Sequence, residues 1–138
     1  MNKTELESLA SIRIKEVEIL ITADCHQGAY YLAGYALECI LKAFITKQVK
    51  EFDFPDKKLA NDSYTHNLAN LVITAGLKQK LTEQEKQNKE FKLNWAVVID
   101  WSEESRYKLA ITKQEAHDLF TAITDNESGV LPWLKKYL

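Results

Sequence analysis

Residues 25–50 constrain the fold of this chain more than any other stretch, because two stripes of side chains run along them at helical spacing. The first stripe is apolar and wide enough for a core face, and it comprises Tyr30, Ala33, Leu37, Ile40, Leu41 and Phe44. The second stripe is polar and aromatic, and it comprises Gln27, Tyr31, Tyr35, Glu38 and Lys42. Residues three or four apart lie on the same side of a helix. The sequence therefore predicts a central helix with one packed face and one face on which a site can form.

The second stripe has a plainer interpretation as solvated helix surface. In that case Glu38 and Lys42 form an ordinary pair at positions i and i+4, which stabilises a helix by only about 0.2–0.5 kcal/mol. Spacing alone favours this structural interpretation. A functional role for the stripe therefore depends on the rest of the chain.

The scarcity of turn-forming residues sets the fold class. Four glycines and two prolines in 138 residues disfavour a many-stranded β fold, which needs frequent turns. A hydrophobic content of 46% is that of a globular protein, and the length fits one domain with its own core rather than two. We therefore expect a single all-α domain over residues 1–138, built as an antiparallel bundle of about five helices.

Three capping-box patterns predict where helices begin. In each pattern a threonine is followed three residues later by a glutamate, and the pairs are Thr4 with Glu7, Thr82 with Glu85 and Thr112 with Glu115. Apolar residues at helical spacing follow the second and third pairs. The side chains expected to face the core are Phe91, Trp95 and Val98 in one helix and Ala116, Leu119, Phe120 and Ile123 in the other.

Turn chemistry predicts the connections between these helices. Residues 51–63 contain Pro55 and a cluster of turn formers, so we expect a loop there. A short helix is expected over residues 68–76, with Gly76 as its stop. Near the C-terminus, Gly129 predicts a bend that leads into a final turn, and we expect Trp133 to dock that turn on the bundle.

Charge and motif content exclude several classes of site. The net charge is −2, and each half of the chain carries as many acids as bases or more, so the footprint of a duplex-binding protein is missing. His26, His66 and His117 are isolated from one another, and no pair of cysteines stands at ligand spacing, so no metal site is expected. The sequence lacks a glycine-rich phosphate loop, and we expect no cofactor.

The two cysteines and the apolar runs indicate the compartment. Cys25 and Cys39 lie on the predicted central helix, about 21 Å apart by helical rise, so they cannot form a disulfide with each other. No apolar run approaches the length of a membrane span, and the first residues lack the apolar centre of a secretion signal. We therefore expect reduced thiols, no membrane association and a cytoplasmic location.

Four short segments in a fixed order resemble the HEPN family (higher eukaryotes and prokaryotes nucleotide-binding domains). They are residues 34–45, Gly-Tyr-Ala-Leu-Glu-Cys-Ile-Leu-Lys-Ala-Phe-Ile; residues 65–71, Thr-His-Asn-Leu-Ala-Asn-Leu; residues 101–107, Trp-Ser-Glu-Glu-Ser-Arg-Tyr; and residues 113–120, Lys-Gln-Glu-Ala-His-Asp-Leu-Phe. The resemblance covers roughly residues 10–125. It implies a bundle with a four-helix up-and-down core, a homodimer, and a bacterial toxin–antitoxin or defence setting with a nucleotidyltransferase as partner.

The chain departs from the ribonuclease members that it resembles. Those members carry an arginine and a histidine separated by four to six residues, whereas ten residues separate Arg106 from His117 and twelve separate Arg13 from His26. The departure favours a non-catalytic domain that binds a nucleotide, an RNA segment or the partner protein, and no catalytic residue is assigned. The alternative is a metal-independent ribonuclease toxin that uses Arg106 with His66 or His117.

The predicted binding cleft combines the second stripe with the arginine–tyrosine pair. We expect Tyr31, Tyr35, Glu38 and Lys42 to line it together with Arg106 and Tyr107, so that rings stack on a base and the guanidinium meets a phosphate. Two alternatives stay open. In the first, the roles are structural: Arg106 pairs with Glu38 to hold the last loop, and His66 caps or packs at the start of the next helix. In the second, the whole chain is a structural interaction module of a larger assembly, as the polar residues 83–90 and the apolar C-terminal Trp133 and Leu138 indicate.

Overall fold

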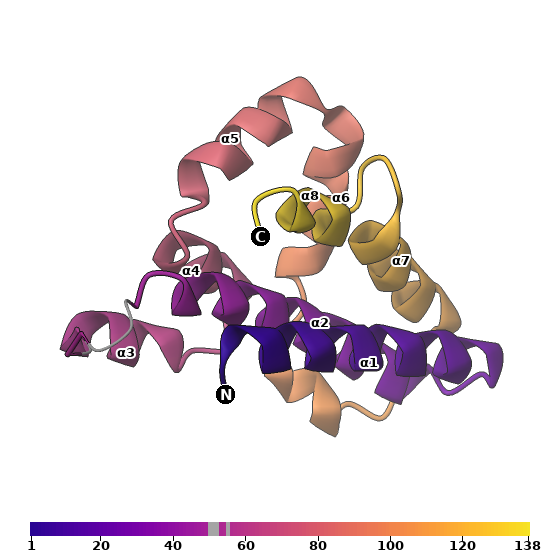
Figure 1. Cartoon of the computed structure of the whole chain (residues 1–138). Helices are drawn as coiled ribbons and strands as arrows, with labels where there is room; N and C mark the ends of the chain where they lie inside the picture. Colours follow the sequence, from indigo (N-terminus) through magenta and orange to yellow (C-terminus); the bar gives the residue numbers. More distant parts are fainter. Residues whose placement is uncertain (50–52, 55) are drawn as a thin grey trace.

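The computed structural model describes residues 1–49, 53, 54 and 56–138, and in these ranges helices joined by turns and loops are the regular structure, without strands (Figure 1). The prediction of an all-α bundle is confirmed. The elements are α1 (Lys3–Thr22), α2 (His26–Thr46), α3 (Lys57–Ser63), α4 (Leu68–Thr74), α5 (Lys78–Gln87), α6 (Lys89–Ile99), the 3-10 helix η1 (Glu103–Tyr107), α7 (Lys113–Thr124) and α8 (Val130–Lys135). None of the described helices has the length and hydropathy that crossing a bilayer requires.

The first two helices form an antiparallel hairpin (Figure 1). The chain reverses at Asp24, which adopts the left-handed conformation with φ 58°. The start of α1 corrects the predicted capping box at Thr4 and Glu7. Asn2 caps the helix instead: its side chain accepts a hydrogen bond from the Glu5 amide at 2.9 Å, and the Glu5 carboxylate accepts one from the Asn2 amide at 2.9 Å.

The central helix exists as predicted and α2 runs from His26 to Thr46, with Lys50 outside the described residues. Its first stripe is the centre of the core, and Ala33, Leu37, Ile40 and Leu41 are all at most 2% exposed. Helices α1, α4 and α7 and the 3-10 helix η1 all pack against it. The two cysteines are free, as expected, with Cys25 exposed and Cys39 buried.

Two expectations about the middle of the chain are wrong. The predicted loop over residues 51–63 contains α3, which Asp56 caps by accepting a hydrogen bond from the Lys58 amide at 3.0 Å, while Pro55 lies outside the described residues. The predicted helix start at Thr82 is an internal position of α5. The helix expected from there is two helices, because Asn88 ends α5 with an extended backbone and caps α6.

The rest of the bundle follows the predicted pattern. The capping box of Thr112 and Glu115 opens α7, and Gly76 follows α4 with φ 76°. The predicted core residues of α6 and α7 are buried or half-buried, and Trp133 docks α8 against Phe91 with ring centroids 5.1 Å apart. The described ranges thus hold more than five helices, because α3 and α8 are short and one long helix is divided.

Candidate functional site

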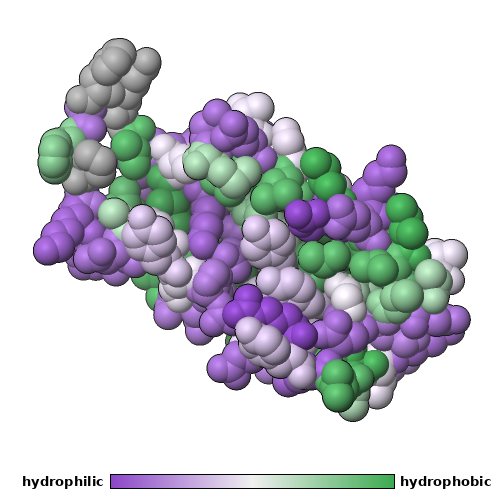
Figure 2. Space-filling model, turned by 90° about the horizontal axis from the view of Figure 1, so that it is seen from below, coloured by the Kyte–Doolittle hydropathy of each residue, from purple (hydrophilic) through white to green (hydrophobic). Residues whose placement is uncertain are grey.

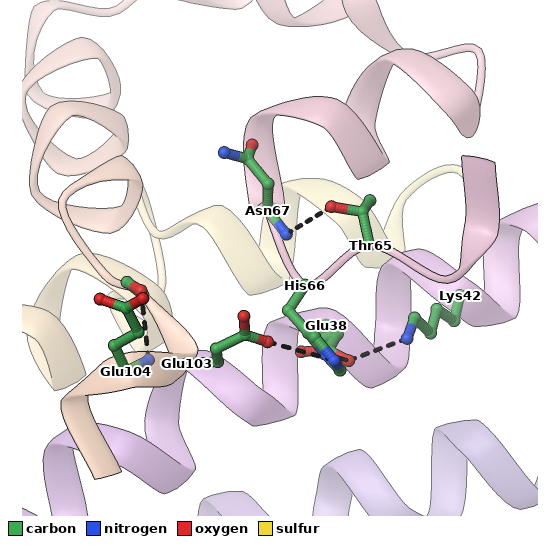
Figure 3. Close-up of polar contacts among 8 residues, drawn as sticks. Glu38, Lys42, Thr65, His66, Asn67, Glu103 and Glu104 are labelled. Carbon is green, nitrogen blue, oxygen red and sulfur yellow. Dashed lines mark hydrogen bonds and ion pairs between the residues drawn. The ribbon is translucent and has the colours of Figure 1, made fainter. Parts of the chain in front are cut away.

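A buried carboxylate marks the candidate site. Glu38, in the middle of α2, is 3% exposed, and its Oε1 accepts hydrogen bonds from Lys42 Nζ and His66 Nδ1, both at 2.9 Å (Figure 3). A charge away from water is costly unless partners of opposite charge or hydrogen bonds stabilise it. Lys42 comes from the next turn of α2 and His66 from the segment before α4, so Glu38 joins two elements.

His66 extends this contact to a third element. Its Nε2 lies 3.1 Å from Glu103 Oε2, at the start of η1, so the imidazole bridges two carboxylates that are far apart in the sequence (Figure 3). Both contacts are ion pairs when the ring is protonated. Capping of α4 falls to Asn67, whose side chain accepts from the Asn70 amide at 2.9 Å, and His66 is left to hold α2 and η1 together.

Aromatic rings continue the site along α2. The rings of Tyr31 and Tyr35 are stacked, with centroids 6.2 Å apart and planes at 13°, and Tyr31 also stacks on Trp101 at 6.3 Å. Gly34 makes room for that indole, because a Cβ at this position would lie 2.1 Å from Trp101 Cε2. Gly34 of α2 thus accommodates the side chain of Trp101, which lies two residues beyond the end of α6.

The 3-10 helix is fixed to α2 through its backbone. The side-chain amide of Gln27 donates hydrogen bonds to the carbonyl oxygens of Ser105 at 3.0 Å and Arg106 at 2.8 Å. Ser105 itself is 1% exposed. The second stripe of α2 therefore positions η1 at one end through Gln27 and at the other through Glu38 and His66.

Arg106 and Tyr107 point away from this anchored backbone. The Arg106 guanidinium carbon lies 4.8 Å from the centroid of the Tyr107 ring, and both residues are exposed, Tyr107 at 73%. The charge interaction with Tyr107 and a hydrogen bond with Tyr31 raise the pKa of Arg106 further above its ordinary value. Arg106 is therefore a permanent cation on the surface.

The six residues predicted for the cleft fall into two adjoining groups. On the η1 side, Tyr31 and Tyr107 each interact with Arg106. Tyr35, Glu38 and Lys42 line a pocket that α1 and α3 complete, and the stacked tyrosines join the two groups. The alternative pairing of Arg106 with Glu38 does not occur among the described contacts, because Glu38 pairs with Lys42 and His66 instead.

Three further points concern the other candidate residues, metal binding and the residues that sequence analysis missed. His117 lies half-buried on α7 and makes no polar side-chain contact with a described residue. In the described part of the chain no three potential ligands gather as they would around a metal ion. Sequence analysis did not single out Glu103 or the anchoring role of Gln27. Both depend on the position of η1, and a short 3-10 helix has no apolar period by which the sequence could indicate it.

No protein-family model, curated protein or solved structure matches this chain. The membership in the HEPN family therefore stays a prediction, and it rests on the four sequence segments.

Proposed function

We propose that this chain is a non-catalytic, HEPN-like domain that binds single-stranded RNA or a nucleotide through Tyr31, Arg106 and Tyr107. One observation supports the proposal above all. Arg106 and Tyr107 form an exposed guanidinium–ring pair on a backbone that Gln27 fixes in place. Rings of this kind stack on bases, and a guanidinium donates charge-assisted hydrogen bonds to phosphate.

The surface around η1 fits a ligand with few charges. Figure 2 views the molecule from the side on which η1 lies, and hydrophobic and hydrophilic patches interrupt one another across this face. A duplex-binding protein instead presents a continuous basic surface to many phosphates. A short unpaired segment or a single nucleotide needs only one cation and one or two stacking rings.

The test is a binding titration with a short fluorescein-labelled single-stranded RNA, measured by fluorescence anisotropy. We expect Tyr107→Ala to weaken binding about 5- to 150-fold, since stacking contributes about 1–3 kcal/mol per base. We expect Arg106→Gln to weaken it and to reduce the slope of log K against log salt by about 1. Unlabelled ATP and GTP as competitors distinguish a nucleotide site from an RNA site.

The matched control is Leu109→Ala, because Leu109 lies two residues after the end of η1 and is 97% exposed. It should leave both affinity and melting temperature unchanged. If wild type binds neither RNA nor nucleotide, or if the three variants bind alike, the proposal is wrong.

A metal-independent ribonuclease is the second candidate function. The observation that favours it is the His66 imidazole between Glu38 and Glu103, with Glu103 and Arg106 on the same 3-10 helix. A histidine held by carboxylates is suited to general acid–base catalysis, and a nearby guanidinium stabilises developing negative charge. Incubation of labelled RNA with the protein and a chelator tests it. Cleavage that His66→Ala and Arg106→Ala abolish, and His117→Ala does not, supports this candidate.

The proposed setting follows from the resemblance, and α1 offers one observation in support of the homodimer. Ile12 and Ile19, two turns apart on α1, are 52% and 60% exposed. Sedimentation of the wild type and of Ile19→Glu tests for a dimer across this face, and a stable dimer argues against a module that needs another chain.

Co-expression with the protein of the neighbouring gene tests for the nucleotidyltransferase partner in a bacterial toxin–antitoxin or defence pair.

A further inference from the structure

A pocket of about 430 Å³ lies between the start of α1, the second half of α2 and α3. Its size falls in the range of small-molecule sites, which are mostly apolar with a few polar groups that orient the ligand. Apolar and aromatic side chains form most of its wall, among them Leu6, Tyr35, Ile45, Leu59, Ala60 and Tyr64. Tyr31, Arg106 and Tyr107 do not line it, so it is separate from the proposed RNA surface.

Glu38 and Lys42 provide the polar end of this pocket. Glu38 Oε1 accepts both hydrogen bonds, from Lys42 and His66, and no described residue donates to Oε2. The Lys42 ammonium has three N–H groups, and its described hydrogen bond uses one of them. The pocket wall therefore presents an acceptor beside a donor.

We propose that this pocket binds a small, predominantly apolar molecule with a neutral carboxamide-type head group, whose N–H donates to Glu38 Oε2 and whose carbonyl oxygen accepts from Lys42 Nζ. A neutral head adds no charge to a site where Glu38 is 3% exposed. An anionic head would lie against the carboxylate, and a cationic head would lie against the ammonium. A polyanionic nucleotide does not fit this wall, so the inference goes beyond the proposed function.

Three probes that differ only in the head group test the chemistry of the site. They are 4-phenylbutanamide, 4-phenylbutanoate and 4-phenylbutylamine, each titrated into the full chain and followed by ligand-observed NMR. We expect the amide to bind at least about tenfold more tightly than either charged analogue, which corresponds to about 1.4 kcal/mol. Absence of amide binding, or equal binding of all three, overturns the proposal.

The two cysteines show where the amide binds without any substitution. Cys39 lines the pocket and is 3% exposed, while Cys25 is exposed at the start of α2. Burial raises the pKa of the Cys39 thiol and slows its alkylation, so the reaction is followed with an excess of a small reagent such as iodoacetamide. At saturation, 4-phenylbutanamide should slow alkylation of Cys39 further, at least about tenfold, and leave the rate at Cys25 unchanged. Binding that leaves Cys39 as reactive as before places the ligand elsewhere and contradicts the proposal.

A pocket-filling variant provides the second readout. Ala60 lines the pocket from α3 and is half-buried, so Ala60→Leu occupies space that the ligand needs. We expect amide binding to fall at least tenfold, with melting temperature and RNA affinity as in wild type. Arg106→Gln should have the opposite effect, with RNA affinity reduced and amide binding as in wild type. The two variants therefore distinguish failure of the pocket proposal from failure of the proposed RNA binding. Undiminished amide binding in Ala60→Leu refutes the pocket assignment.

Discussion

Replacing Gly34 by alanine tests the packing that holds the candidate site. The new Cβ would lie 2.1 Å from Trp101 Cε2, 2.2 Å from Cδ2 and 2.3 Å from Nε1, all atoms of a rigid ring that is 4% exposed. Ordinary carbon contacts begin near 3.5 Å, so the indole must retreat by about 1.4 Å. Its movement is opposed by Tyr31, which stacks on the indole at 6.3 Å.

Two effects of opposite sign set the magnitude of this change. Overpacking a core costs about 1–3 kcal/mol, whereas alanine is favoured over glycine inside a helix by about 1 kcal/mol. Because the new Cβ meets a rigid, buried ring, the overpacking cost lies in the upper part of this range, at about 2–3 kcal/mol. We therefore expect a net loss of about 1–2 kcal/mol in the free energy of unfolding, or about 3–8 °C in melting temperature for a chain of this size. RNA affinity should fall as well, because Trp101 leads directly into η1.

The control for this variant is Gly28→Ala in the same helix. A Cβ at Gly28 meets only Leu20 Cδ1 at 3.5 Å, an ordinary contact, so this variant should be as stable as wild type or more stable by up to about 1 kcal/mol. Urea unfolding of both variants gives the comparison. In the Gly34→Ala background, Trp101→Phe should recover part of the loss, since a smaller ring needs less space and the buried Trp101 Nε1 has no partner among the described residues. A Gly34→Ala variant as stable as Gly28→Ala refutes the packing argument.

Three further perturbations test other parts of the structure. Glu38→Gln removes the buried charge that Lys42 contacts and should lower the free energy of unfolding by roughly 1–3 kcal/mol, measured by urea unfolding. The control is Asp62→Asn in the exposed Lys58–Asp62 pair, which should change the same quantity by less than about 0.5 kcal/mol. Burial, followed by the charges of Glu115 and Asp100, raises the pKa of Tyr30 above its ordinary value of 10.0. The unfolded chain therefore releases this proton first, and the free energy of unfolding should fall as the pH rises past about 10. Tyr30→Phe should make this fall less steep, and an unchanged slope would contradict the reasoning. Gln27→Leu removes two hydrogen bonds to η1, so it should weaken RNA binding several-fold and lower the free energy of unfolding by about 1–2 kcal/mol. An RNA affinity equal to that of wild type would show that Gln27 does not position Arg106.

Local chemistry explains which helices the sequence predicts correctly. The apolar stripe of α2 and the capping box of Thr112 and Glu115 depend on neighbours within one or two turns, and both are found in the structure. The capping pattern at Thr82 has the same residue types, but the backbone at Asn88 interrupts the helix and α5 begins earlier, at Lys78. Polar residues without an apolar period leave such a boundary undetermined.

The candidate site shows a similar division. The spacing of Gln27, Tyr31, Tyr35, Glu38 and Lys42 places them on one side of α2, and the contacts from Tyr31 to Tyr35 and from Glu38 to Lys42 lie within one helix. The adjacency of Arg106 and Tyr107 is also given by the chain itself. These features are local, so helix geometry is sufficient to predict them.

The sequence by itself determined an all-α chain, its central helix and the set of polar and aromatic side chains along that helix. Only the tertiary structure decided what they contact. His66 reaches Glu38 across 28 positions and Gln27 reaches Arg106 across 79, and such separations are set by how the helices pack. The packing divides the predicted cleft into an exposed guanidinium–ring surface and an apolar pocket, because η1 packs on α2 whereas α3 forms the wall of the pocket beside the second half of α2.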